Sequence, residues 1–158
     1  MCGVAGIIVD SNSSENPLDL NKCITSMCEN MNLRGPDNFG TWLEKESLVA
    51  FGHRRLSIID LDNRANQPMH SNENRFVIVF NGEIYNFKEL RSILIKRGVK
   101  LKSNCDTEVL LHFFIIYKEK CLDFFEGMWS FVIFDTKNKT FSITFGILSN
   151  HFCNIAGL

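Results

Sequence analysis

Short apolar runs rich in β-branched and aromatic residues recur along the chain and predict β-strands. Clusters of Gly, Pro, Asn, Asp and Ser separate these runs, as expected for turns. The predicted strands cover residues 4–9, 47–53, 55–61, 75–80, 128–135 and 140–145. The last two flank the turn "TKNK" and predict an antiparallel hairpin. "NGEIYN" follows the fourth strand and is expected to interrupt it.

Helical periodicity separates several of these strands. A first helix is predicted from Asn16, which can cap it, and Pro17, which suits its first turn, to about residue 32. Its apolar positions recur at helical spacing and are Leu20, Ile24, Met27 and Met31. Asn86 with Glu89 three residues later predicts a capping box at the start of a second helix.

A third helix is predicted over residues 109–117, capped by Asp106 or Thr107. Its almost continuous apolar sequence indicates that it is buried. Helices and strands thus mix without a regular β-α-β repeat, and the hairpin is antiparallel, so the fold class is α+β. Neither GxGxxG nor GxxxxGK[ST] occurs in the chain, which excludes phosphate-binding loops of those two types.

Composition and charge narrow the class of partner. The 158 residues are 45% hydrophobic and 22% charged with a net charge of −1, as in a soluble globular domain. This charge gives no electrostatic reason to expect nucleic acid or a membrane surface as partner. No signal peptide and no apolar run of about 20 residues is apparent, so a cytoplasmic location is expected. The six cysteines and four histidines lack metal-ligand spacing, so no metal site is predicted.

The opening "MCGVAG" places a candidate nucleophile at the chain's start. Removal of Met1 would leave Cys2 with a thiol and a free α-amine on one residue. Free α-amines titrate near neutral pH, so this amine can accept the thiol proton and serve as the base of the nucleophile. Gly3 and Gly6 would let the strand backbone approach a substrate closely. The alternative, on this stretch alone, is an incidental buried thiol at a strand start.

Five further stretches, in order, carry a family resemblance: "LRGPDNFG", "FGHRRLSIIDL", "QPM", "FNGEIYN" and "SNCDTEVLLH". Together with the opening cysteine they resemble the glutaminase (class II glutamine amidotransferase) domain of asparagine synthetases. The resemblance extends from the first residue to about residue 135. It implies an N-terminal nucleophile hydrolase fold, with two antiparallel sheets between helices (αββα). It also implies hydrolysis of L-glutamine to glutamate and ammonia for asparagine synthesis.

The resemblance also implies residue roles. Cys2 would be the nucleophile, and the Asn81 side chain with the Gly82 N–H would form the oxyanion hole. Substrate contacts would come from Arg55, Ile58, Ile59, Asn81, Glu83 and Asp106. Each role has a simpler alternative: a plain Asn-Gly turn, a solvent-facing pair Arg54–Arg55, and a helix-capping Asp106. Cys105 is interpreted as a packed thiol, and "RGPD" as a loop that shapes the pocket.

The resemblance ends after the hairpin. Asparagine synthetases continue with a segment of the type RDRFGxKPLYY, whereas this chain reads "TFGILSNHFCNIAGL". We therefore expect an amidotransferase domain over residues 1–145, a divergent tail over 146–158 without a place in the core, and a fold that is incomplete at its C-terminus. No cofactor is expected, because ATP and Mg would belong to a synthetase domain. Candidate partners are L-glutamine and a separate synthetase domain or subunit. A non-catalytic glutamine-binding or partner-binding remnant is the alternative function.

Overall fold

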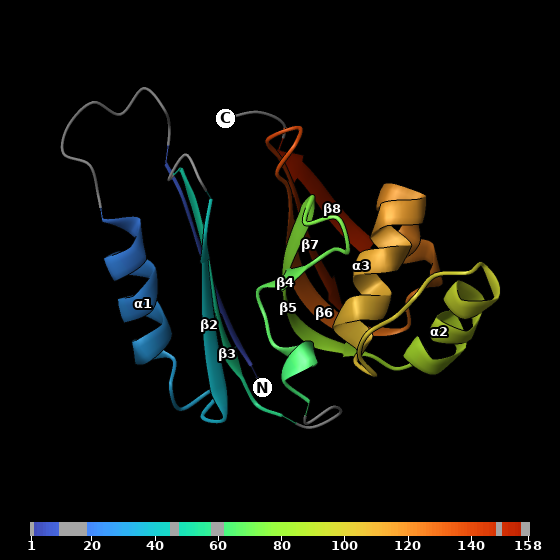
Figure 1. The fold of residues 1–158 in the computed structure, drawn as a ribbon, viewed down its shortest axis with the longest axis horizontal. Helices are drawn as coiled ribbons and strands as arrows, with labels where there is room; N and C mark the ends of the chain where they lie inside the picture. The colour runs from blue at the N-terminus through green and yellow to red at the C-terminus, as the bar shows by residue number, and fades with distance from the viewer. Residues whose placement is uncertain (1, 10–18, 45–47, 58–61, 148–149, 156–158) are drawn as a thin grey trace.

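Two sheets lie face to face with helices on both outer sides, giving four layers (Figure 1). The computed structural model describes all residues except 1, 10–18, 45–47, 58–61, 148–149 and 156–158, and only the backbone of 147 and 150–155. This helix–sheet–sheet–helix order confirms the predicted αββα architecture and the α+β class.

The smaller sheet consists of β1 (Gly3–Ile8), β2 (Asn38–Leu43) and β3 (Val49–Arg55), antiparallel in the order β1-β3-β2. Helix α1 (Leu20–Asn30) covers its outer face. Leu20 and Ile24 of this helix are buried against Ala5 and Ala50 of the sheet. These small residues let the helix approach the strands closely.

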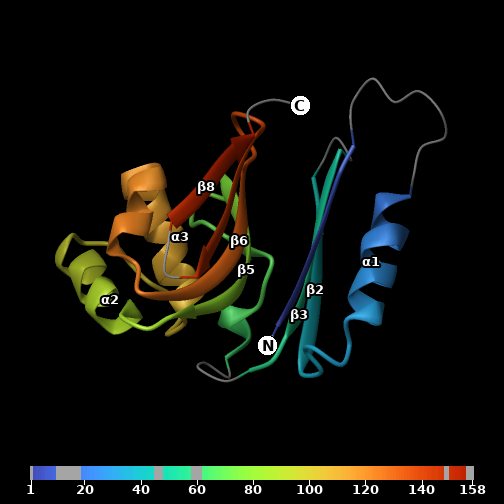
Figure 2. The same ribbon diagram turned by 180° about the vertical axis from the view of Figure 1, so that it is seen from behind.

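The larger sheet has the order β4-β5-β6-β7-β8, also antiparallel. Its strands are β4 (Met69–His70), β5 (Phe76–Ile84), β6 (Gly127–Asp135), β7 (Thr140–Ile147) and β8 (Asn150–Ile155). The view from behind shows these strands crossing beside the helices (Figure 2). Strand β4 is short and pairs with β5 only at Val77 and Ile78. From Val79 onward, this edge of β5 is not covered by β4.

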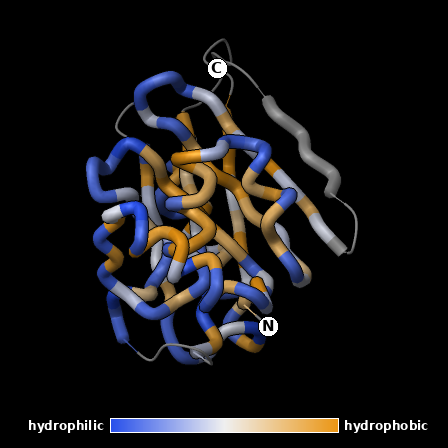
Figure 3. Tube along the Cα trace, turned by 90° about the vertical axis from the view of Figure 1, so that its right-hand side faces the viewer, coloured by the Kyte–Doolittle hydropathy of each residue, from blue (hydrophilic) through white to orange (hydrophobic). Residues whose placement is uncertain are grey.

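The outer layer on this side consists of α2 (Phe87–Lys96) and α3 (Asp106–Tyr117). Helix α3 is buried from Asp106 to Phe114, which confirms the predicted buried helix. Its apolar side chains join those of β5 and β6 in the largest core cluster. Figure 3 shows the hydrophobic stretches gathered in the central strands and helix, with hydrophilic stretches in the outer turns.

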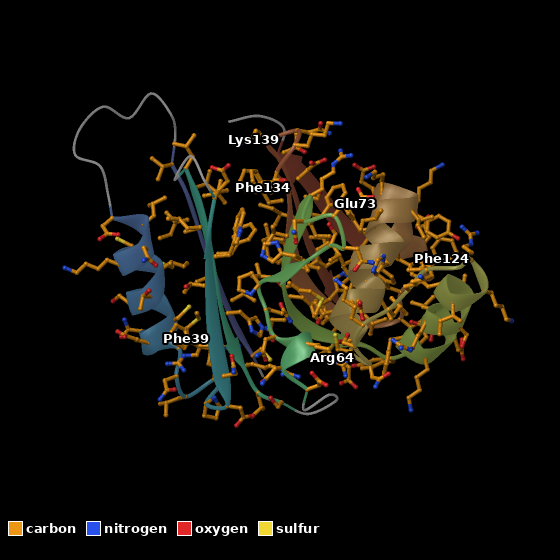
Figure 4. All side chains as sticks on the ribbon, viewed as in Figure 1. Phe39, Arg64, Glu73, Phe124, Phe134 and Lys139 are labelled. Atoms are coloured by element: carbon orange, nitrogen blue, oxygen red, sulfur yellow. The ribbon has the colours of Figure 1, made fainter. Side chains whose placement is uncertain are left out.

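A second core fills the space between the sheets. Phe51 of β3 packs with Phe134 and Phe141 from the β6–β7 hairpin, and valines from both sheets complete the cluster. Phe134, labelled in Figure 4, lies in this layer. Arg64 and Lys139 mark opposite ends of the molecule in the same view.

The β6–β7 hairpin and the first strand were predicted correctly, but two strand predictions were wrong. The expected strand at 55–61 is wrong in its described part: β3 ends at Arg55, residues 56 and 57 are irregular, and 58–61 lie outside the described residues. Strand β2 was missed, because Gly35, Pro36 and Gly40 in the stretch "LRGPDNFG" indicate a turn rather than a strand. Gly40 instead allows close approach, since a Cβ there would lie 2.3 Å from the carbonyl oxygen of Gln67.

The expected interruption of the fourth strand at "NGEIYN" is also wrong. Strand β5 continues through Asn81, Gly82 and Glu83, which pair with Ser130, Trp129 and Met128 of β6. Gly82 has φ +155°, a conformation that side-chain-bearing residues rarely adopt. The Asn-Gly pair is therefore part of the sheet, and the plain-turn alternative is contradicted.

The helix starts differ from those expected. Asp19 caps α1 by accepting from the Lys22 N–H at 3.1 Å, while the expected cap, Asn16, and Pro17 lie outside the described residues. Asn86 precedes α2 but makes no side-chain cap. Its amide bonds the backbone of Phe124 and Glu126 instead, at 2.9 and 3.2 Å, so no capping box forms.

The C-terminal tail was expected to have no place in the core, and the structure shows that part of its backbone joins the sheet. Strand β8 pairs with β7 over Phe141–Gly146, and the predicted boundary at 145/146 falls within β7. Main-chain hydrogen bonds form the ladder, and an open strand edge pairs with many different sequences. Because its pairing depends on the main chain, the side-chain pattern of the tail did not predict this strand.

Candidate active site

A cavity of about 70 Å³ lies where the first residues of the chain come close to β5. The short 3₁₀ helix Asn63–Ala65, which contains Arg64, lies at this end of the sandwich, opposite Lys139 (Figure 4). The N-terminal end of β1 lies at the same end (Figure 1). The cavity is lined by Cys2, His53, Arg55, Leu56, Ala65, Gln67, Phe80, Gly82, Cys105, Asp106 and Thr107. Residues that are up to 105 positions apart in sequence thus meet at one site.

Cys2 is held at the mouth of this cavity by backbone contacts. Its Sγ accepts from the Leu56 N–H at 3.4 Å and lies 3.8 Å from the Leu56 carbonyl oxygen. Arg34 donates from Nε to the Cys2 carbonyl oxygen at 3.3 Å. The thiol is half-buried, so it is both positioned and accessible to a molecule in the cavity.

The "RGPD" loop fixes the residues that contact Cys2. Gly35 packs against β3, where a Cβ would lie 2.4 Å from the Arg54 carbonyl carbon. The Asp37 carboxylate accepts from the Ser57 N–H at 2.7 Å. The loop therefore fixes the chain on both sides of Leu56, in line with its expected role in shaping the pocket.

Strand alternation decides which arginine faces the cavity. Arg54 points to the outer face, where its Nε donates to the Cys28 carbonyl oxygen of α1 at 2.8 Å. Arg55 points inward and is 8% exposed, so the solvent-facing alternative is contradicted. Its Nη1 donates to the Asp62 carbonyl oxygen at 3.1 Å and to Asn66 Oδ1 at 2.8 Å. Neutral acceptors thus orient the guanidinium beside the cavity.

The edge of β5 beyond β4 supplies backbone groups to the cavity. The Phe80 N–H donates to Gln67 Oε1 at 2.6 Å, and the Ile84 N–H donates to Asp106 Oδ2 at 3.3 Å. In an antiparallel strand alternate residues direct their N–H groups to the same side. Gly82 lies between these two residues and lines the cavity, so its N–H points into it.

The structure brings four of the predicted site residues into one cavity: Cys2, Arg55, Gly82 and Asp106. Asn81 and Glu83 are adjacent on β5 but do not line it, and their side chains are partly exposed and exposed, respectively. Both continue the row of Val77 and Val79, on the face that looks toward the smaller sheet. Ile58 and Ile59 lie outside the described residues.

Asp106 is the first residue of α3, and the capping position belongs to Cys105. Its carboxyl is 5% exposed, and burial raises its pKa to about 6 despite hydrogen bonds from the backbone of Ile84 and Thr107. Cys105 is buried beside Ser103 Oγ at 3.1 Å, and burial raises the pKa of its thiol. A raised pKa disfavours the thiolate, as expected for a packed cysteine rather than a second nucleophile.

Replacing Asp106 by asparagine should stabilise the protein in a pH-dependent way. Because the folded-state pKa lies about two units above the ordinary 3.8, folding favours the protonated carboxyl, and ionisation opposes folding by up to about 3 kcal/mol. We expect Asp106→Asn to raise the free energy of unfolding at pH 8 by up to about this amount. The gain should shrink as pH falls through 6 and vanish below about 4. Denaturant titrations at several pH values measure it.

Asp135→Asn is the matched control, with the opposite sign. Burial disfavours the charge of Asp135, but hydrogen bonds from Arg75, Asn138 and Lys137 leave its pKa below the ordinary value. Its removal should therefore destabilise the protein at pH 8 and matter less at low pH. An Asp106→Asn protein that is less stable than the parent at pH 8 would show that the buried charge is compensated.

Several cavity residues were not predicted as site residues, and a hydrogen-bond chain connects four of them: His53, Phe80, Gln67 and Thr107. His53 Nε2 lies 3.2 Å from the Phe80 carbonyl oxygen, and Gln67 donates from Nε2 to Thr107 Oγ1 at 3.2 Å. His53 could have been found from strand alternation, because it lies two positions before Arg55 in "GHRRL". Gln67 lies in the "QPM" stretch of the family resemblance, but its hydrogen bonds could not be predicted, because they depend on where β4 ends along β5.

The described residues offer neither a metal site nor a membrane span. No group of three or more His, Cys, Asp or Glu side chains is arranged to hold a metal ion in the described part of the chain. Within the same residues no helix is both long and apolar enough to cross a bilayer. The arrangement is therefore a thiol, a backbone donor, a guanidinium and a carboxyl around one small cavity.

Sequence comparisons relate this chain to known proteins. The family model described as "Glutamine amidotransferase domain" matches residues 1–146. Asparagine synthetase [glutamine-hydrolyzing] 1 of Bacillus subtilis is 37% identical over 150 residues, which is 92% of this chain and 22% of that protein. The Zea mays asparagine synthetase [glutamine-hydrolyzing] is 33% identical over 141 residues, 89% of this chain and 23% of that protein. The chain thus spans about a fifth of the length of these relatives.

A solved structure shares the fold. The glutamine phosphoribosylpyrophosphate amidotransferase from B. subtilis, complexed with ADP and GMP, superposes with a TM-score of 0.53 at 22% identity. The match covers 63% of this chain and 23% of that one. At this identity the likeness concerns the fold.

Proposed function

This chain belongs to the glutamine amidotransferase domain family, and from that membership we propose that it hydrolyses L-glutamine to L-glutamate and ammonia, with Cys2 as the nucleophile. The observation that carries the proposal is the meeting of Cys2, Arg55, Gly82 and Asp106 around one cavity. Each of these groups matches one chemical requirement of the reaction.

The reaction begins once Met1 has been removed. The free α-amine of Cys2 accepts the thiol proton, and the thiolate attacks the carboxamide carbon. The negative charge that develops on the carboxamide oxygen is stabilised by the Gly82 N–H, with the Asn81 side-chain amide as the second donor. Collapse of the tetrahedral intermediate breaks the carbon–nitrogen bond. The departing nitrogen takes the proton held by the amine and leaves as ammonia.

Water completes the cycle. The α-amine of Cys2 accepts a proton from water, which attacks the thioester carbon. Glutamate leaves, and the thiol regains its proton. Because one residue carries both the sulfur and the base, the reaction needs no separate catalytic histidine.

The amino-acid end of glutamine requires a cation and a carboxylate. Arg55 suits the α-carboxylate, because a guanidinium can bind it through two parallel hydrogen bonds. Asp106 and Glu83 suit the α-ammonium. Asp106 is ionised above pH 6, where its pKa of about 6 leaves it negatively charged. Backbone groups of Ile58 and Ile59 would complete this subsite, as the family resemblance implies.

Ammonia produced here requires an acceptor. The curated relatives carry the name asparagine synthetase, and this chain corresponds to about a fifth of their length. We therefore propose that the ammonia is used for asparagine synthesis by a synthetase domain or subunit, which would also hold ATP and Mg. The chain's own contribution is glutamine hydrolysis.

Processing of Met1 tests the proposal directly. Ammonia release should rise in proportion to the fraction of molecules that lack Met1, as determined by intact mass, because a residue preceding Cys2 replaces the free amine with a peptide bond. Fully processed protein that releases no ammonia, yet melts at a higher temperature with L-glutamine, would instead support a non-catalytic glutamine-binding module. Equal activity in processed and unprocessed protein would contradict the mechanism.

A further inference from the structure

His53 is a buried residue of the cavity that the mechanism above does not use. It is 1% exposed and lies among the residues that line the same cavity as Cys2 and Arg55. Its Nε2 lies 3.2 Å from the Phe80 carbonyl oxygen, and a carbonyl oxygen can only accept a hydrogen bond. Nε2 therefore carries the proton. Burial lowers the pKa of His53 to about 4, so the ring is neutral and Nδ1 is an unprotonated acceptor.

Nδ1 of His53 has no hydrogen-bond partner within the described part of the chain, although it is fully buried. The nearby amide donor, Gln67 Nε2, is already bonded to Thr107 Oγ1. The residue opposite His53 on β1 is Val4, which has no polar side chain. Buried acceptors in folded proteins are almost always satisfied. The partner of Nδ1 is therefore sought among molecules that enter the cavity.

The groups of glutamine can be assigned one by one to the groups around the cavity. The proposed function assigns the α-carboxylate to Arg55, the α-ammonium to Asp106 and the carboxamide oxygen to Gly82. The carboxamide N–H groups are then the only donors of the substrate without a partner. Among the buried side-chain atoms of the described residues, the acceptor that lacks a donor is His53 Nδ1, and His53 lines the cavity.

Resting on the proposed function, we propose that His53 Nδ1 accepts a hydrogen bond from the carboxamide N–H of bound glutamine. His53 is then a specificity-determining residue that favours a carboxamide over a carboxylate. Glutamate, the product, presents only oxygen acceptors at this position, and two facing lone pairs repel. Sites that bond a polar group of the substrate discriminate strongly against analogues that lack it. The same atom would therefore select the substrate and favour release of the product.

Two substitutions test the roles of the two ring nitrogens separately. In His53→Gln the side-chain amide can reach the Phe80 carbonyl oxygen as Nε2 does, but the acceptor at the Nδ1 position is lost. In His53→Asn the amide oxygen occupies the Nδ1 position, but the Phe80 hydrogen bond is lost. Both are made in a Cys2→Ala background, so that bound glutamine is not consumed. Dissociation constants for L-glutamine and L-glutamate are measured by calorimetry, and melting temperatures without ligand.

We expect His53→Gln to weaken glutamine binding about 10-fold and to leave glutamate binding unchanged or tighter, with little change in melting temperature. His53→Asn should lower the melting temperature and retain the preference of the background protein for glutamine. A His53→Gln protein with an unchanged ratio of the two dissociation constants would overturn the assignment. If the Cys2→Ala protein itself binds no glutamine, the proposed function fails first, independently of His53.

A spectroscopic measurement tests the same hydrogen bond in a protein that retains His53, so it does not require the His53 variants to bind ligand. Nitrogen-15 spectra of the Cys2→Ala protein, labelled at its four histidines, report the unprotonated Nδ1 directly, and His53→Gln identifies its resonance. L-glutamine should move this resonance upfield, as a new hydrogen bond to the lone pair does, whereas L-glutamate should not. Binding of glutamine without this shift would overturn the proposal.

Discussion

Replacing Cys2 by alanine is expected to lower the rate of ammonia release from L-glutamine by at least about 10³-fold, because removal of a covalent nucleophile eliminates the main reaction path. The dissociation constant for glutamine should change much less, since Arg55 and Asp106 hold the amino-acid end of the substrate. The Cys2 thiol is half-buried and its hydrogen bonds in the described part of the chain go to the backbone of Leu56, so the variant should fold. Steady-state ammonia release and calorimetric binding of glutamine measure the two effects.

Cys23→Ala is the matched control for Cys2→Ala. Cys23 is also a partly exposed thiol, but it lies on α1, on the far side of the smaller sheet from the cavity. Its removal should leave the rate of ammonia release essentially unchanged. Cys2→Ala protein that is folded, processed and as active as the Cys23→Ala protein would exclude Cys2 as the nucleophile.

The elements predicted correctly are those whose sequence pattern is strong and local. The β6–β7 hairpin has continuous β-forming residues on both sides of a polar turn. Helix α3 has too many successive apolar residues for any exposed element. For such segments the local pattern and the tertiary environment agree, so the sequence alone was sufficient.

Two of the wrong predictions share one cause, which is glycine inside a strand. Gly40 of β2 lies in "LRGPDNFG", which predicts a turn, and Gly82 of β5 lies in "NGEIYN", which was expected to interrupt the strand. Both serve instead where another backbone lies close: a Cβ would fall 2.3 Å from Gln67 O and 2.2 Å from Met128 O, respectively. Close approach depends on segments distant in sequence, so no local pattern could show it.

The same contrast between local pattern and distant contacts holds for the site residues. Cys2 and Arg55 are recognisable from their chemistry and spacing. The chain of contacts through His53, Phe80 and Gln67 exists only because β4 ends early and leaves the edge of β5 open to side chains. Which side chains bond the free backbone groups at the edge of a strand is decided only when the sheet has assembled, and no local sequence pattern shows it.

Gly82→Ala should be the most disruptive single substitution near the cavity. The added Cβ would lie 2.2 Å from the Met128 carbonyl oxygen and 2.6 Å from the Trp129 Cα, and the backbone has φ +155°. Backbone atoms of a central strand cannot move aside without breaking the β5–β6 ladder. We expect the free energy of unfolding to fall by more than about 3 kcal/mol, the range in which strain and overpacking combine. Denaturant titration measures this loss.

Gly98→Ala isolates the contribution of the contact with β6. Gly98 also has a positive φ, +81°, but a Cβ added there would meet nothing within 4 Å. Its substitution should therefore lower the free energy of unfolding by only about 1–2 kcal/mol, the strain of a left-handed residue. Alanine retains the backbone N–H, so any folded Gly82→Ala protein that binds glutamine but releases ammonia slowly has a displaced oxyanion donor. Equal destabilisation by the two substitutions would mean that β5 is not packed against β6 at Gly82 as described. The inference that the Gly82 N–H points into the cavity would then be contradicted.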